Sequence, residues 1–147
     1  MSGKMVIQLI TLAVLVVGAG AVMAGEDDHA AIESTVRDYV DGWYAGDAAR
    51  IERALHPDLA KRVVRTLPDG TEYLDTASAS NMVAYTAVGF GKGKLPEGYV
   101  NQVTILETTG KIAMAKSVSP EFIDYIHLAK TTEGWKIVNV LWEPVEQ

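Results

Sequence analysis

Four polar side chains near the carboxy terminus lie in a sequence that otherwise predicts buried strands. Asp124, Tyr125 and His127 lie in the apolar run 122–128, and Asn139 lies in the next one. Because side chains alternate along a strand, Asp124 must face the opposite side from Tyr125 and His127. Burial favours the neutral form of a carboxyl group, which can donate a hydrogen bond or act as a base. The alternative is that Asp124 pairs with a lysine, an arginine or a backbone amide near a rim.

Tyr39 is a second candidate for polar contact with a ligand. It lies on the apolar face of a predicted helix, eight residues before Asp47. A phenol can donate a strong hydrogen bond while its ring stays buried, although a tyrosine on a helix face can also be a packed aromatic. Trp43 and Tyr85 are candidates to stack on a flat heteroaromatic ligand.

Two amides complete the predicted binding set. Asn101 and Asn139 lie in predicted strands, where an amide can hydrogen-bond a ligand carbonyl or ring nitrogen, or can satisfy a local bulge. The predicted ligand-binding residues are therefore Tyr39, Trp43, Tyr85, Asn101, Asp124 and Asn139. If the protein is an enzyme, Tyr39 and Asp124 are the residues expected to be catalytic.

The three histidines do not form a metal-binding pattern. His29 precedes the first predicted helix and is expected to be solvated, whereas His56 is expected to stabilise carbonyl groups at a helix end. His127 is expected to face a partner subunit. None lies at the short spacing typical of zinc ligands, so neither a metal site nor a cofactor is predicted. The glycine-rich segment 89–98 lacks the spacing of a phosphate-binding loop and is predicted to be a flap beside a cavity mouth.

The elements that must position these residues follow from periodicity and turn signals. Apolar residues at three- and four-residue spacings predict an amphipathic helix over Ala30–Ala45, which Gly46 ends. The other predicted elements are a second helix capped by Asp47 and running to Leu55, with Pro57 closing it; a hairpin over Ala60–Asp75; a third helix capped by Thr76 or Ser78 and running to Val88; and strands over Tyr99–Glu107, Lys111–Val118, Glu121–Thr131 and Trp135–Glu143.

The last two predicted strands are apolar on both faces. One face can pack against the helices. The other would expose a large apolar patch, for which a second copy of the chain is the simplest cover. A homodimer through the outer face of the sheet is therefore expected.

Composition indicates a single compact domain, with 147 residues of which 48% are hydrophobic and 22% charged. The formal net charge of -6 argues against a nucleic-acid-binding protein, which needs a basic surface. The absence of cysteine excludes disulfides, thiolate metal sites and thiol nucleophiles.

Residues 1–24 have the pattern of a secretory signal peptide. A single positive charge at Lys4 precedes an uncharged run, and Val22-Met23-Ala24 suits a signal peptidase. Cleavage after Ala24 would leave 25–147 as one domain in the periplasm or outside the cell. The alternative is an uncleaved membrane anchor, because Met5–Ala24 is 20 residues long and could span a bilayer.

Four motifs carry a resemblance to a known fold family. They are 39–47 (YVDGWYAGD), 55–58 (LHPD), 122–128 (FIDYIHL) and 134–139 (GWKIVN). In this order they resemble the nuclear transport factor 2-like superfamily and, within it, the group called putative lumazine-binding proteins. The resemblance implies an α+β cone, in which three N-terminal helices pack on a strongly curved antiparallel sheet around a cavity that Asp124 faces. The chain is therefore expected to be an exported protein that binds a small apolar or aromatic molecule without transforming it.

The competing expectation is an enzyme of the isomerase, cyclase or dehydratase kind. Ketosteroid isomerases share the cone fold and resemble this chain in carrying a tyrosine at the spacing of Tyr39 as an oxyanion donor. The position of their aspartate base falls on Val63 here, and valine cannot accept a proton. A third expectation is a structural or partner-binding domain whose cavity is filled by its own side chains.

Overall fold

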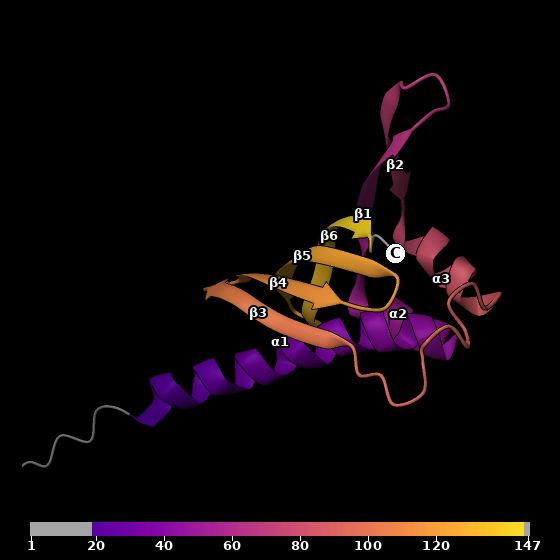
Figure 1. The fold of residues 1–147 in the computed structure, drawn as a ribbon. Coiled ribbons are helices and arrows are strands. Elements are labelled where there is room, and N and C mark those ends of the chain that lie inside the picture. The colour runs from indigo at the N-terminus through magenta and orange to yellow at the C-terminus, as the bar shows by residue number, and fades with distance from the viewer. Residues whose placement is uncertain (1–18, 146–147) are drawn as a thin grey trace, which may run out of the picture.

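The computed structural model describes residues 19–145, so residues 1–18 of the predicted leader lie outside it. One long helix, two short helices and a six-stranded sheet make up this part of the chain (Figure 1). The long helix α1 (Ala19–Ala45) runs along one side of the sheet, and the hairpin formed by β1 and β2 rises away from the other strands (Figure 1). The predicted α+β cone is confirmed.

The first two helices meet at the predicted Gly-Asp corner. Gly46 has a φ of 69°, in the left-handed region that glycine adopts without strain, and ends α1. The side chain of Asp47 then accepts a hydrogen bond of 3.1 Å from the backbone N–H of Arg50 and caps α2 (Ala48–Ala54). The helix α1 begins at Ala19, before the predicted Ala30.

The sheet has the order β2-β1-β6-β5-β4-β3. Neighbouring strands are antiparallel except β1 and β6, which are parallel. The sheet is therefore mixed, and the prediction of a wholly antiparallel sheet is wrong. The predicted hairpin and the four later strands are confirmed. The strands are β1 (Leu55–Thr66), β2 (Glu72–Ala77), β3 (Gln102–Thr109), β4 (Ile112–Val118), β5 (Phe122–Thr131) and β6 (Gly134–Pro144).

The first strand begins directly after α2, at Leu55 instead of the predicted Ala60. A register shift between Leu55 and Ala60 in the pairing with β6 accommodates Pro57, which cannot donate a ladder hydrogen bond. The prediction that Leu55 belongs to the second helix and that Pro57 closes that helix is therefore wrong.

The third helix, α3 (Ala79–Ala87), is capped by Ser78 and not by Thr76. The hydroxyl of Ser78 accepts from the backbone N–H of Asn81, and the Asn81 side chain accepts from the backbone N–H of Ser78, which forms a capping box. This helix and α2 lie at the same end of the molecule as the C-terminal end of α1 (Figure 1).

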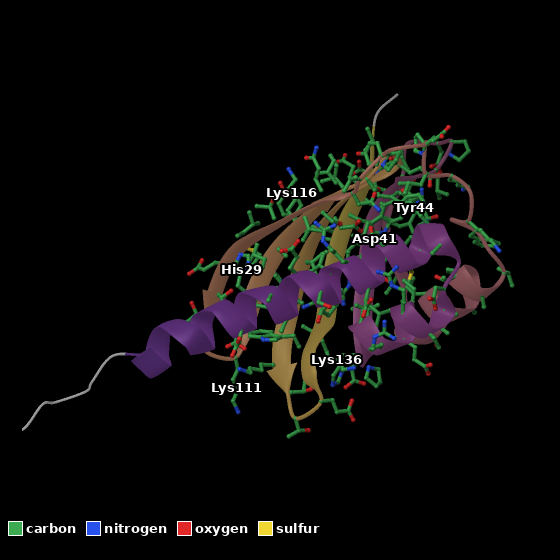
Figure 2. The ribbon with its side chains drawn as sticks, turned by 90° about the horizontal axis from the view of Figure 1, so that it is seen from below. His29, Asp41, Tyr44, Lys111, Lys116 and Lys136 are labelled. Carbon is green, nitrogen blue, oxygen red and sulfur yellow. The ribbon has the colours of Figure 1, made fainter. Side chains whose placement is uncertain are left out.

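The core lies between α1 and the concave face of the sheet. Ile32 and Val36 of α1 are fully buried, as are Ile126 of β5 and Ile137 of β6. Figure 2 shows α1 lying across the strands, with the labelled Asp41 and Tyr44 near its C-terminal end. The opposite face of the sheet remains open, since Tyr125 and Leu141 are 48% and 56% exposed. Within residues 19–145, no helix combines the length and the apolarity needed to cross a membrane.

Candidate functional site

A cavity of about 220 Å³ opens between the C-terminal half of α1, the β1–β2 hairpin, α3 and the ends of β5 and β6. Its wall is mostly apolar and carries several polar side chains. The residues that line it are Tyr39, Val40, Trp43, Tyr44, Lys61, Val63, Arg65, Asp75, Thr76, Ala77, Met82, Tyr85, Ser119, Phe122, Asp124 and Trp142. The space is therefore not filled by the protein's own side chains.

A buried cluster of four polar side chains borders this cavity. Lys61 Nζ donates to Asp124 Oδ1 at 2.7 Å and to the Tyr39 hydroxyl at 2.6 Å. The Tyr39 hydroxyl donates to Asp124 Oδ1 at 3.1 Å, and Ser117 Oγ donates to Asp124 Oδ2 at 3.2 Å. All four residues are buried, at 8% exposure or less. Because a lysine ammonium has three N–H groups, these contacts leave one donor of Lys61 for a molecule in the cavity.

The sheet topology brings the cluster together. The parallel pairing of β1 with β6 sets Lys61 beside Val140, and the antiparallel pairing of β5 with β6 sets Asp124 beside Trp142. Ser117 on β4 pairs directly with Asp124. Strand alternation places Lys61, Val63 and Arg65 on the cavity side of β1. The site therefore depends on the β1–β6 contact, which joins residues far apart in the chain.

Burial shifts the titration of two members of the cluster. It raises the pKa of the Tyr39 phenol well above its usual value, and the adjacent Asp124 carboxylate adds to the rise. Burial lowers the pKa of the Lys61 ammonium, an effect that the charge and hydrogen bond of Asp124 oppose. Tyr39 is therefore a neutral phenol at physiological pH. The amine, the phenol and the carboxylate are close enough to exchange protons directly.

Aromatic rings and a second charged pair surround the cluster. Lys61 Nζ lies 4.8 Å from the centroid of the Trp142 ring, and the guanidinium of Arg65 lies 5.2 Å from the same ring. Arg65 also pairs with Asp75 of β2 at 3.6 Å, and both side chains are about half exposed. The positive charges of Lys61 and Arg65 are thus each matched by a carboxylate, so the cavity wall has no net charge from these four groups.

Tyr44 and Ser119 form a second polar contact of the wall. The Tyr44 hydroxyl donates to Ser119 Oγ at 3.0 Å, and Ser119 Oγ in turn bonds the backbone of Phe122. Burial raises the pKa of Tyr44 to about 12, and the hydrogen bond with Ser119 lessens the rise. This contact ties α1 to the turn between β4 and β5.

Four of the predicted binding residues line the cavity: Tyr39, Trp43, Tyr85 and Asp124. The Trp43 ring packs edge to face on Phe122 with centroids 6.4 Å apart. Tyr85 is 38% exposed and stacks on Phe90, which follows α3. Tyr85 therefore lies in a part of the wall that solvent reaches.

Strand alternation also holds as expected on β5. Asp124 is buried, whereas Tyr125 and His127 are exposed on the other face. The alternative of an ion pair for Asp124 describes its surroundings, although the partner Lys61 lies inside the cavity wall and not near a rim.

Asn101 and Asn139 do not lie in this cavity, contrary to prediction. Asn101 is buried one residue before β3, where its Nδ2 donates to Asp41 Oδ1 on α1 at 2.9 Å. Asn139 is exposed and pairs with His127 across β5 and β6, because the strand phase that buries Val140 turns its neighbour outward.

The histidines lie away from the cluster. His29 and His127 are exposed, and His56 lies at the start of β1, where its Nδ1 accepts from the backbone N–H of Asp58 at 3.1 Å. His56 thus stabilises a bulged strand and not the helix end that was predicted. Residues 19–145 hold no cluster of three histidine, aspartate or glutamate side chains suited to a metal ion.

Two members of the buried cluster, Lys61 and Ser117, were not among the predicted site residues. The segment 59–63 (LAKRV) places Lys61 in phase with Leu59 and Val63, both of which are buried. A lysine at an inward position of a strand, together with an unpaired inward aspartate on another strand, is the signal that could have indicated the pair.

Comparison with known proteins places the chain in a family. A protein-family model described as "Putative lumazine-binding" matches residues 27–143. No curated protein sequence matches the chain significantly.

Solved structures show the same fold at low identity. An NTF2-like protein of unknown function from Silicibacter pomeroyi is similar with a TM-score of 0.63 and 18% identity, over 82% of this chain and 98% of that chain. One from Shewanella baltica has a TM-score of 0.61 and 14% identity, over 88% and 100%. An NTF2-like protein with a cystatin-like fold from Novosphingobium aromaticivorans has a TM-score of 0.60 and 17% identity, over 86% and 87%.

Proposed function

We propose that this chain, which belongs to the putative lumazine-binding family, binds a small aromatic molecule with a polar edge in the cavity beside Lys61. The observation that carries the proposal is an apolar cavity with one buried polar cluster at its wall. Such a combination is typical of small-molecule sites, where apolar walls give affinity and a few polar groups fix orientation.

The size of the cavity limits the ligand. Pockets for drug-sized molecules have volumes of about 300–1,000 Å³, and this cavity has about 220 Å³. One or two fused rings therefore suit it better than a three-ring flavin with a side chain. A ring carbonyl or ring nitrogen can accept the remaining N–H of Lys61, while Trp142 and Phe122 contact the ring.

Calorimetric titration with two probes tests this proposal. Lumazine, a two-ring pteridine dione, is expected to bind in the cavity. Riboflavin carries a third ring and a ribityl chain, and it is expected to bind more weakly or not at all. Tighter binding of riboflavin than of lumazine, or binding of neither, would contradict the proposed ligand class.

We also propose that the protein is a homodimer through the outer face of the sheet. Tyr125 and Leu141 are cross-strand neighbours on that face and are 48% and 56% exposed. Ile112 is 64% exposed on β4. Exposed apolar groups on one sheet face favour burial against the same face of a second copy of the chain.

Export is the third part of the proposal. The leader pattern ends at Val22-Met23-Ala24, and cleavage there would start the helix α1 at Gly25. Asp27 and Asp28 would then lie in its first turn, where negative charge is favourable. Intact mass of the protein recovered from the producing cells is expected to lack residues 1–24, and a full-length mass would contradict cleavage.

A further inference from the structure

The amine of Lys61 lies in surroundings that differ from those of a solvated lysine. Its side chain is 10% exposed, its Nζ faces the Trp142 ring at 4.8 Å, and it lines the cavity. An amine withdrawn from water loses its proton more easily and is then a nucleophile.

We propose that Lys61 captures small aromatic aldehydes or ketones as an imine at Nζ. The inference rests on the proposed function, because the same cavity must admit the molecule. It adds a covalent step that the binding proposal does not require.

The groups needed for imine formation are all within hydrogen-bond distance of Lys61. Asp124 Oδ1, at 2.7 Å, can accept the proton that the ammonium must lose before Nζ attacks a carbonyl carbon. The Tyr39 hydroxyl, at 2.6 Å from Nζ, donates to the same carboxylate oxygen and can pass protons between the amine and that oxygen. Burial lowers the pKa of Lys61, which increases the fraction of free amine at a given pH.

The step balances without a cofactor. The ammonium gives one proton to Asp124, and the free amine forms a C–N bond as the carbonyl π electrons move to oxygen. A second proton moves from nitrogen to that oxygen, and the protonated Asp124 returns the first proton to the resulting hydroxyl. The C–O bond breaks, water leaves and a protonated imine remains. One positive charge enters and one remains, beside the Asp124 carboxylate that paired with the ammonium.

The apolar wall selects which carbonyl compounds can react. A flat ring can contact Phe122 and Trp142, while its carbonyl carbon points toward Nζ. The 220 Å³ volume admits a benzaldehyde-sized molecule and disfavours long sugars, which also lose their hydration on entry. The site thus favours aromatic over polar carbonyl compounds.

Reductive trapping tests the inference on the whole protein. The protein is incubated with benzaldehyde and sodium cyanoborohydride, and the adducts are located by intact mass and peptide mapping. The expected result is a benzyl group at Lys61 in most chains, with an occupancy several-fold above that of any other lysine. Adducts spread evenly over exposed lysines such as Lys111 would overturn it.

Two controls separate this inference from the binding proposal. Lys61→Arg keeps a positive charge for Asp124 but cannot form an imine, so it should lose the adduct while retaining its circular dichroism spectrum.

Benzyl alcohol has the ring without the carbonyl, and its binding is followed by tryptophan fluorescence of the wild type. Binding of benzyl alcohol with no adduct from benzaldehyde would overturn the imine and leave the binding proposal standing. If neither molecule binds or reacts, both fail.

Discussion

Lys61 on β1 and Asp124 on β5 meet at 2.7 Å although 63 positions separate them in the chain and β6 lies between their strands. Their contact exists only when the hairpin is joined to the later strands. The pair therefore links the stability of the fold to the chemistry of the cavity.

Removing the charge of Asp124 should destabilise the protein. Asp124→Asn leaves the buried Lys61 ammonium without its counter-charge, and breaking a buried pair in this way costs about 3–5 kcal/mol. Asp75→Asn is the matched control, because Asp75 pairs with Arg65 at 3.6 Å near solvent and such pairs contribute about 0–1 kcal/mol. Urea unfolding measures both. Equal losses in the two variants would contradict the role given to the buried pair.

Stability should decline between pH 10 and about 12. The pKa of Tyr44 is raised to about 12 in the fold, so the folded chain keeps a phenol proton that the unfolded chain has lost above its usual pKa of 10.0. This contribution is intact below pH 10 and is lost as the pH rises toward 12. Burial of Tyr39 acts in the same direction. Lys61 has the opposite effect: because its pKa is lowered in the fold, it makes the free energy of unfolding rise with pH up to its usual pKa of 10.5.

Tyr44→Phe isolates the contribution of that phenol. The variant should show a shallower decline over pH 10–12 in the free energy of unfolding, measured by urea titration at each pH. Its stability at neutral pH should fall by about 1 kcal/mol, since the hydrogen bond to Ser119 is lost. A decline as steep as that of the wild type would show that Tyr44 does not titrate as inferred.

Gly91 is expected to tolerate no side chain. A Cβ there would lie 2.3 Å from Nε1 of Trp43, so Gly91→Ala must displace the indole from the cavity wall. Overpacking of this kind costs about 1–3 kcal/mol. Gly25→Ala is the control, because a Cβ at Gly25 meets no atom within 4 Å. Thermal unfolding and lumazine affinity should both fall for Gly91→Ala alone. Unchanged stability and affinity in Gly91→Ala would show that Gly91 does not lie against the Trp43 indole.

The outer face of the sheet can be tested by adding charge to it. Leu141→Lys should convert the proposed dimer into a monomer, because a buried interface does not accommodate an unpaired ammonium. Val88→Lys carries the same change at the end of α3, where Val88 is 70% exposed and lies away from the sheet face. Light scattering of both variants should show a monomer for the first and a dimer for the second. A monomeric wild type would refute the dimer proposal.

Local signals in the sequence were sufficient for most of the fold. The Gly46-Asp47 corner, the Ser78 cap and the strand alternation around Asp124 each depend on a few neighbouring residues, and the structure has all three. The parallel β1–β6 pairing was not predictable in this way, because its partners lie far apart in the chain.

The site shows the same division between local and long-range information. Tyr39 and Asp124 were recognised as polar residues on apolar faces, and both line the cavity. Lys61 was missed because its importance comes from pairing across β6. Asn139 was misplaced because a register shift between Ile137 and Asn139 reverses the alternation of β6, so the two residues face opposite sides. Long-range register thus decides which polar residues meet.

Filling the cavity with a larger side chain tests whether a ligand binds there. Val63 and Val64 are consecutive on β1, but Val63 is 3% exposed and lines the cavity, whereas Val64 is 55% exposed on the other side. Lumazine is titrated into Val63→Phe and Val64→Phe by calorimetry, with circular dichroism as the check on folding. Val63→Phe is expected to lose lumazine binding, and Val64→Phe is expected to bind lumazine like the wild type. Unchanged binding in a folded Val63→Phe variant would show that the ligand does not occupy this cavity.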